Sequence, residues 1–465
     1  MTTEPVARLI ISMAIPSIGS MIVSSIYNFA DTYYISQLGT SVAAVPGISQ
    51  PLFLIIQAVS LTLAVGAGSY AARALGRKEN DNASKAVSTS FFLSVMIGTL
   101  IGILSLIFLP QLMTAFGATS TILPHAEDYA RYVIYATPFF SATFVMSYAI
   151  RQEGNVRIAV IGTIAGAIIN IALDPLLIFV FDMGIKGAAV ATSLSQMVSF
   201  TILFQFLLRG KCVVRLKFKY FSLDRHILGD VLKVGSPDFF RTLLASLAAI
   251  LLNTSARPYG DTVLAGMTVC NKIIVVIVSA LMGFGQGFQP MCGYNYGAKI
   301  YDRVKKGFRF TLSVGLAAMT VVFVTGMIFA PQIMSLFRRE DTEFIDVGSR
   351  ILRASLTALL PATVTIIANM LFQACGKAPQ SAIIALSRNG IVFIPLILLM
   401  PRLWGLNGVI WAQPTADIIT LIAALIMLFM LWKNLNRLER EAKEQEAEGL
   451  NTEEQKGQNH QAKEG

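Results

Sequence analysis

Residues 110–116 read PQLMTAF, and residues 331–337 read PQIMSLF, 221 positions later. The same offset aligns GRKENDNASK at residues 76–85 with GAKIYDRVKK at residues 297–306. Further pairs at this offset are Pro16 and Pro237, Gly39 and Gly260, Gly66 and Gly287, Gly184 and Gly405, and Gly187 and Gly408. So many matches at one offset, without gaps, indicate an internal repeat, so both halves of the chain are expected to share one fold.

The composition indicates a membrane protein. Apolar residues make up 54% of the 465 residues and charged residues only 14%, whereas a soluble domain uses about 25% charged residues to cover its surface. The formal charge of +10 would suit nucleic acid, but the basic residues lie between apolar runs rather than along one soluble face. We therefore expect membrane lipid around the protein and no nucleic-acid partner. The chain contains no phosphate-binding loop, catalytic triad or zinc spacing, so an enzyme is not expected.

Twelve apolar runs are long enough to cross a bilayer as helices, which predicts an all-α polytopic membrane protein. The runs lie at about 9–36, 44–72, 86–109, 126–149, 158–181, 187–208, 229–255, 261–288, 305–330, 345–372, 379–400 and 406–432. Each repeat holds six of them, an even number, so both copies run through the membrane in the same direction. Two pseudo-symmetric six-helix lobes are expected, with the substrate path between them.

These spans divide the chain into four parts. We expect an N-lobe at 1–208 (helices one to six), a cytoplasmic linker at 209–228, a C-lobe at 229–432 (helices seven to twelve) and a polar cytoplasmic tail at 433–465. Lys and Arg are concentrated in the linker, the tail and the loops on the same side. Since cytoplasmic loops carry the excess of basic residues, both termini are predicted to be cytoplasmic, in a multi-pass protein of the cell (inner) membrane.

Two acidic residues lie deep inside apolar runs of the N-lobe. Asp31 stands in SIYNFADTYYI at 25–35, and Asp174 stands in AIINIALDPLLIF at 167–179. A carboxylate in hydrocarbon is costly, so acids in such positions usually face the protein interior and serve a function. Their alternative role is simple hydrogen bonding between helices.

Two neutral side chains complete a candidate ion site with these acids. Asn170 shares a helical face with Asp174, four residues later, and Thr192 enters from helix six. Asp31, Asn170, Asp174 and Thr192 offer the hard oxygen ligands that suit Na⁺. The same carboxylates could instead take up a proton, and the sequence leaves Na⁺ and H⁺ both open.

Other residues of the apolar runs are candidates for conformational or substrate roles. Pro16 removes a backbone hydrogen bond and is expected to kink helix one, while Pro175 disfavours helical geometry at the preceding Asp174. Tyr27, one turn before Asp31, and the intramembrane amides Gln50 and Gln57 are candidates for the cavity wall or for substrate contacts. Packing alone could also explain each of them.

Four segments form a recognisable set, namely FADTYYI at 29–35, RQEGN at 151–155, NIALDP at 170–175 and GFQPMCGYNYGAK at 287–299. Together they resemble the multidrug and toxic compound extrusion (MATE) transporters, in particular the bacterial DinF-like or MepA-like branch. The resemblance implies twelve helices in two lobes. It also implies an N-lobe ion site, which maps to Asp31, Asn170, Asp174 and Thr192, and a switching proline, which maps to Pro16. Some members carry an acid in helix seven where this chain has Ala245, so we place coupling in the N-lobe.

The resemblance and the buried acids predict a secondary active multidrug efflux antiporter. It would export cationic or amphipathic organic small molecules in exchange for Na⁺ or H⁺, without a cofactor, and as a monomer. One alternative is a lipid-linked-precursor flippase of the same superfamily, which would need basic residues in its central cavity, whereas the deepest charges are expected to be mostly acidic. A second alternative is a passive channel or receptor, which would need no coupled carboxylates.

Overall fold

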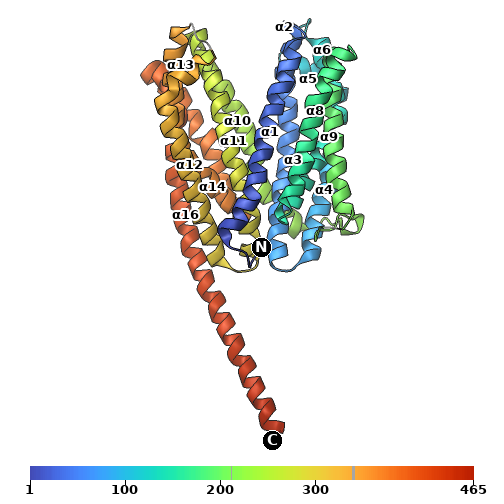
Figure 1. The fold of residues 1–465 in the computed structure, drawn as a ribbon, viewed down its shortest axis with the longest axis vertical. Helices are drawn as coiled ribbons and strands as arrows, with labels where there is room; N and C mark the ends of the chain where they lie inside the picture. Colours follow the sequence, from blue (N-terminus) through green and yellow to red (C-terminus); the bar gives the residue numbers. More distant parts are fainter. Residues whose placement is uncertain (211, 338–340, 465) are drawn as a thin grey trace.

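The computed structural model describes residues 1–210, 212–337 and 341–464, and these residues form helices and no strand. The helices of the two halves of the chain form two bundles that stand side by side (Figure 1). The first bundle contains α1 (Val6–Ser36), α2 (Thr40–Ala43), α3 (Val45–Gly76), α4 (Asn80–Ile107), α5 (Leu109–Ala115), α6 (Leu123–Tyr135), α7 (Thr137–Gln152), α8 (Val156–Pro175), the π-helical turn η1 (Leu176–Val180) and α9 (Gly184–Leu208).

The 3₁₀ turn η2 (Phe218–Tyr220) lies between the bundles in sequence. The second bundle contains α10 (Arg225–Ala256), the 3₁₀ turn η3 (Arg257–Tyr259), α11 (Asp261–Gly297), α12 (Tyr301–Ser335), α13 (Thr342–Thr357), α14 (Leu359–Ala374), α15 (Ala378–Leu386), the π-helical turn η4 (Ser387–Ile391) and α16 (Phe393–Glu464). We refer to the two bundles as the first and second lobes.

The helices account for the twelve predicted membrane spans. Ten helical segments of the described chain are long and apolar enough to cross a membrane, and the bent pair α6 and α7 raises this number to 11. The longest segment, Ala378–Ala442, holds two predicted spans, because the backbone at Gly405 leaves helical geometry with φ of 55° and ψ of −135°. Counting its two legs separately gives twelve, so the predicted all-α, twelve-helix fold is confirmed.

Two of the spans are broken where the sequence shows continuous apolar runs. The fourth span bends by 49° between α6 and α7, and Pro138 stands at the start of α7. The tenth span breaks at Ala358, between α13 and α14, and Pro361 follows in the first turn of α14. Proline has no backbone N–H to continue the preceding helix, and it begins a new helix without loss.

The repeat seen in the sequence reappears in the backbone conformation of the turns. Positive φ angles occur at pairs 221 positions apart, namely Gly39 (111°) and Gly260 (97°), Lys78 (64°) and Lys299 (61°), and Gly184 (53°) and Gly405 (55°). A positive φ is uncommon for a residue other than glycine, so its occurrence at both lysines is specific. The two lobes are therefore pseudo-symmetric copies, as predicted.

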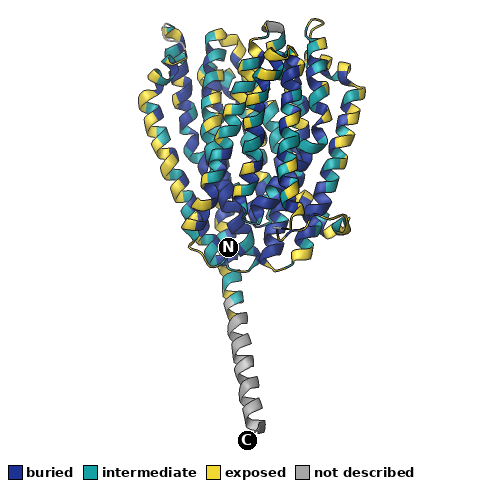
Figure 2. Ribbon diagram, turned by 45° about the vertical axis from the view of Figure 1, so that its right-hand side comes forward, coloured by how far each residue is buried: buried dark blue, intermediate teal, exposed yellow. Residues whose placement is uncertain are grey.

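The lobes meet near the N-terminus and diverge toward the opposite end (Figure 1). Helix α1 packs against α11, and α3 packs against α10. A Cβ atom on Gly76 would lie 2.0 Å from the carbonyl oxygen of Tyr294, and one on Gly297 would lie 2.1 Å from that of Arg73. Tyr294 follows Arg73 by 221 positions, so these two contacts are equivalent under the repeat. Buried residues gather at this end of the molecule, which we call the closed end (Figure 2).

Polar groups also cross between the lobes at the closed end. The guanidinium of Arg73 pairs with the carboxylate of Asp230, and the Ser69 hydroxyl donates to the backbone oxygen of Gln373. A further Arg73 N–H group donates to the backbone oxygen of Ala374 at 3.5 Å. Backbone and charged groups of the two lobes are therefore bonded to each other at this end.

The segment between the lobes is bonded to the first lobe. The carboxylate of Glu153 accepts from the backbone N–H groups of Val213 at 3.2 Å and Val214 at 2.6 Å. Thr89 on α4 exchanges two hydrogen bonds with the backbone of Ser222, each 3.0 Å long. Burial raises the pKa of the Glu153 carboxyl above its ordinary value. These contacts place the segment against α4 and the loop after α7.

We expect Gly66→Ala and Gly297→Ala to destabilise the closed end. A Cβ atom at either position would lie within 2.1 Å of a backbone oxygen of the other lobe, and neither backbone can give way without moving a helix. Such overpacking costs about 1–3 kcal/mol, so the thermal unfolding temperature in detergent should fall. The control is Gly229→Ala, because a Cβ atom there meets open space. Equal unfolding temperatures for all three variants would contradict the close packing.

Candidate functional site

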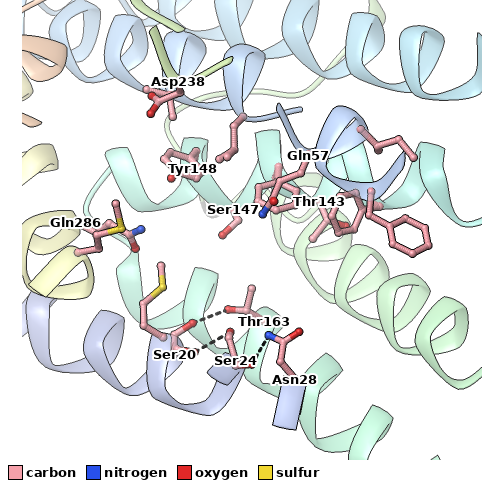
Figure 3. A pocket seen from close by; sticks show the side chains of 18 of the residues that line it. Ser20, Ser24, Asn28, Gln57, Thr143, Ser147, Tyr148, Thr163, Asp238 and Gln286 are labelled. Carbon is pink, nitrogen blue, oxygen red and sulfur yellow. Dashed lines mark hydrogen bonds between the residues drawn. The ribbon is translucent and has the colours of Figure 1, made fainter. Parts of the chain in front are cut away.

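A cavity of about 830 Å³ lies between the lobes, and side chains from both lobes line it. The first lobe contributes residues of α1, α3 and α6 to α9, and the second contributes residues of α10, α11, α14, α15 and η4. Figure 3 shows part of its wall, with Ser20, Ser24 and Asn28 on one side and Asp238 on another. A volume of this size fits a drug-sized organic molecule.

The four predicted ion-site residues lie on three helices of the first lobe. Asp174 and Asn170 on α8 have no exposed surface, and Asn170 Nδ2 lies 3.5 Å from Asp174 Oδ1 and 3.4 Å from Thr192 Oγ1 on α9. With the amide turned over, Asn170 donates to Asp174 Oδ2 at 3.1 Å and accepts from the Thr192 backbone N–H at 3.2 Å. In either orientation Asn170 links α8 to α9 and holds the Asp174 carboxylate in place.

Asp31 brings the second carboxylate from α1. It lines the cavity, its Oδ1 atom is buried without a hydrogen-bond partner, and it interacts electrostatically with Asp174. Within the described chain, no Lys or Arg pairs with either acid. A buried polar atom without a partner is costly, and a bound cation or proton would remove that cost.

The donor set suits a small monovalent cation better than a transition metal. The described residues contain no group of three or more His, Cys, Asp or Glu side chains that could hold a metal ion. The carboxylates of Asp31 and Asp174 and the hydroxyl of Thr192 supply oxygen atoms, which fit Na⁺, while Asn170 turns its amide nitrogen toward Asp174 and positions it, and the carboxylates alone fit a proton. The unpartnered Oδ1 atom of Asp31 is the observation that favours such an ion.

The three predicted cavity residues all lie on the wall, namely Tyr27 on α1 and Gln50 and Gln57 on α3. The wall also contains a polar row on α1 that the sequence reading missed: Ser20 lies 3.3 Å from the hydroxyl of Thr163, and Asn28 Nδ2 donates to the backbone oxygen of Ser24 at 2.7 Å (Figure 3). The spacing of four residues between Ser20, Ser24 and Asn28 marks one helical face, and this spacing could have revealed the row.

The two candidate kink prolines both lie within helical backbone. Helix α1 continues through Pro16 as one helix. Pro175 ends α8 with φ of −63° and ψ of −32°, and Asp174 remains in the helix, so the expected loss of helical geometry at Asp174 is wrong. The chain instead continues into the π-helical turn η1 directly after Pro175.

The charges of the cavity wall differ from the expectation that they are mostly acidic. Three arginines line it, Arg151, Arg241 and Arg388, together with the acids Asp31 and Asp238. Arg388 lies on η4, inside the eleventh span rather than in a loop.

Two of the three arginines have a carboxylate partner, so their charges are offset. Arg241 pairs with Asp238 at 3.0 Å, as its spacing of three residues suggests. Arg388 pairs with Asp417 at 2.7 Å. The second pair was missed because its members are 29 residues apart in sequence.

Comparison with known proteins places this geometry in one family. A family model described as MatE matches residues 16–176 and 237–399, which begin at the repeat-related Pro16 and Pro237. "Multidrug export protein MepA" of Staphylococcus aureus (strain MSSA476) is 26% identical over 434 residues, covering 92% of this chain and 94% of that protein.

Two solved structures match over nearly the whole chain. One is described as "Outward-facing conformation of a multidrug resistance MATE family transporter of the MOP superfamily", with a TM-score of 0.87 and 26% identity over 93% of this chain and 97% of that one. The other, "Crystal structure of MATE in the bent conformation", has a TM-score of 0.87 and 25% identity over 94% of this chain and 100% of that one. Together with the family model, these matches show that the chain belongs to the MATE family of multidrug efflux transporters and is a multi-pass membrane transporter rather than an enzyme.

Proposed function

We propose that this protein is a secondary active antiporter that exports cationic or amphipathic organic compounds in exchange for Na⁺ or H⁺. The observation that carries the proposal is the buried, unpartnered carboxylate oxygen of Asp31 on the cavity wall, with Asp174 behind it and no basic partner for either acid in the described chain. The name of the MepA relative, a multidrug export protein, supports the same activity.

Coupling follows from the position of Asp31 on a helix that touches both lobes. Helix α1 carries Asp31 and Tyr27 on the cavity wall, and it packs against α11 of the second lobe. A cation bound at Asp31 offsets the charge that would otherwise attract an organic cation, so ion and substrate oppose each other. An ion or substrate can shift the equilibrium between two conformations only by binding one of them more tightly.

The membrane orientation proposed from the sequence determines to which side of the membrane the cavity opens. With both termini cytoplasmic, the closed end of the molecule faces the cytoplasm and the cavity opens outward, as in the relative described as outward-facing. In this arrangement 1–208 and 229–432 are the two lobes, 209–228 is the cytoplasmic linker and 433–465 is the cytoplasmic tail. The protein acts as a monomer in the lipid of the cell (inner) membrane.

The lipid-linked-precursor flippase is the second candidate, because the cavity wall carries three arginines. A flippase would need these charges free to hold phosphate groups. Arg241 and Arg388 are instead paired with Asp238 and Asp417, which leaves Arg151 as the one cavity arginine without a carboxylate partner among the described residues. One free cation favours a substrate with few negative charges, and the antiporter remains the better fit.

We expect Asp31→Asn and Asp174→Asn to lose gradient-driven export. The amide keeps the size of the side chain but cannot bind a proton and attracts Na⁺ only weakly, so ion uptake no longer opposes substrate binding. Efflux of a cationic dye from proteoliposomes, under an imposed Na⁺ or pH gradient, should fall to the level of protein-free vesicles.

The matched control is Asp302→Asn, which removes an exposed acid that pairs with Lys306 at 2.8 Å outside the cavity. Normal pumping by both site variants would show that the ion site is misplaced. If wild-type protein moves no tested dye under either gradient, the antiporter proposal is wrong.

We expect Pro16→Ala to slow turnover while leaving dye affinity nearly unchanged. Alanine restores the backbone hydrogen bond that proline lacks and stiffens α1, whereas Pro16 itself is absent from the cavity wall. Relatives described as MATE "in the bent conformation" and "in the straight conformation" support more than one conformation in this family. The control is Pro110→Ala at the start of α5, where the missing N–H is not needed. Equal transport rates for Pro16→Ala and wild type would remove Pro16 from the mechanism.

A further inference from the structure

Arg151 is a buried cation at the closed end of the cavity, and the described residues supply no counter-ion for it. It lies at the end of α7, lines the cavity and is only 5% exposed. One of its terminal N–H groups donates to the side-chain oxygen of Gln286 on α11, its guanidinium carbon lies 5.8 Å from the ring centre of Tyr148, and its Nε atom has no partner. An uncompensated buried charge costs several kcal/mol, so the site is incomplete as the protein alone presents it.

Two acids could be considered as partners for Arg151, and both already accept hydrogen bonds from other groups. Glu153, two residues later, accepts from the backbone N–H groups of Val213 and Val214. Asp238 accepts from Arg241 at 3.0 Å through one oxygen and from Gln373 at 2.8 Å through the other. Glu153 does not line the cavity, and the charge of Asp238 is offset by Arg241, so neither acid forms an ion pair with Arg151.

The residues around Arg151 leave its positive charge uncancelled at the closed end of the cavity. Tyr148, whose ring lies beside the Arg151 guanidinium, lines the same cavity as Asp238 and Arg241. Figure 3 shows Tyr148 between Asp238 and Ser147, with Gln286 on the opposite lobe. The Asp238–Arg241 pair has no net charge, and the net charge of this end of the cavity is therefore the single positive charge of Arg151.

We propose that the closed end of the cavity is a subsite for one anionic group, the carboxylate of a zwitterionic or anionic amphipathic substrate, held by Arg151. A guanidinium presents a planar fork that matches a carboxylate, and a single positive charge balances one carboxylate. The subsite deepens the proposed export function and rests on it for the statement that its occupant is a transported substrate.

The subsite is separate from the candidate ion site. Arg151 contacts Gln286, and the neighbouring Gly287 packs against Ala14 of α1. Asp31 follows Ala14 by 17 residues on the same helix, which corresponds to about 25 Å along its axis. A drug-sized molecule that places its carboxylate on Arg151 therefore leaves Asp31 free for the coupling ion. The cavity has a negative open end and a positive closed end.

The bond between Arg151 and Gln286 crosses from the first lobe to the second. Any conformation in which the lobes separate at the closed end must break this bond. The subsite therefore changes its composition during transport, which gives an anionic group different affinities in the two conformations, as directional transport requires.

The test compares rhodamine 6G, a cationic ethyl ester, with its zwitterionic free acid. The two dyes differ only in that the acid has a carboxylate where rhodamine 6G has the ethyl ester. Equilibrium binding of each dye to the full-length protein in phosphatidylcholine nanodiscs is measured for wild type, Arg151→Gln and Arg151→Lys. Losing a charge-assisted hydrogen bond weakens binding by about 10- to 100-fold, so Arg151→Gln should lose the acid by this factor and retain the ester. Arg151→Lys keeps the charge but not the planar guanidinium, so its affinity for the acid should lie between those of wild type and Arg151→Gln.

The matched control is Arg157→Gln, which removes an exposed arginine of α8 that does not line the cavity. Equal losses for both dyes, or for neither, in Arg151→Gln would overturn the proposal. If that variant does not fold, wild type still decides, because it must bind the acid at least as tightly as the ester. Displacement of the acid alone by added phosphatidylglycerol would assign the subsite to a lipid phosphate and also overturn it.

The binding comparison needs no ion gradient. Failure of wild-type protein to move the ester under either gradient would therefore reject antiport and leave the binding result for the subsite intact.

Discussion

A charge placed inside a membrane protein must be paired, hydrated or used, because hydrocarbon cannot solvate it. This constraint sorts the charged residues of the cavity into two groups. Arg241 with Asp238, and Arg388 with Asp417, are ion pairs within the second lobe. Among the described residues, Asp31 and Arg151 have no partner of opposite charge, and each keeps a buried polar atom without a hydrogen bond, as Asp417 does at its second oxygen. The unpaired charges, one of each sign, are where an ion and a substrate gain most by binding.

The location of these charges depends on how the two lobes touch. Glycine at the closed end allows backbone to meet backbone, and the contacts Gly76 with Tyr294 and Gly297 with Arg73 are related by the repeat. With no side chain between the helices at these contacts, the backbones of the two lobes pack directly against each other. The duplicated sequence thus gives equivalent glycine contacts in both lobes. The charges of the cavity do not follow the repeat, because Asp31 corresponds to Leu252 in the other half.

The sequence predicted the parts of this structure that depend on local pattern. Continuous apolar runs gave the spans, the offset of 221 positions gave the two lobes, and the helical spacing of Asn170 and Asp174 placed them together. Features set by contacts distant in sequence were missed. The Arg388–Asp417 ion pair joins two spans. Neither segment alone therefore shows that the charge of its residue is offset by a partner. The proline rule alone favoured a break at Asp174, whereas Asp174 stays helical and a π-helical turn follows Pro175.

The segment that connects the lobes has a mechanical consequence through its bonds to Glu153 and Thr89. Because Val213, Val214 and Ser222 are fastened to the first lobe, this stretch travels with that lobe as one rigid body. The free tether between the two bodies is then confined to the few residues between Ser222 and the start of α10 at Arg225. So short a tether limits how far the start of α10 can move from the first lobe.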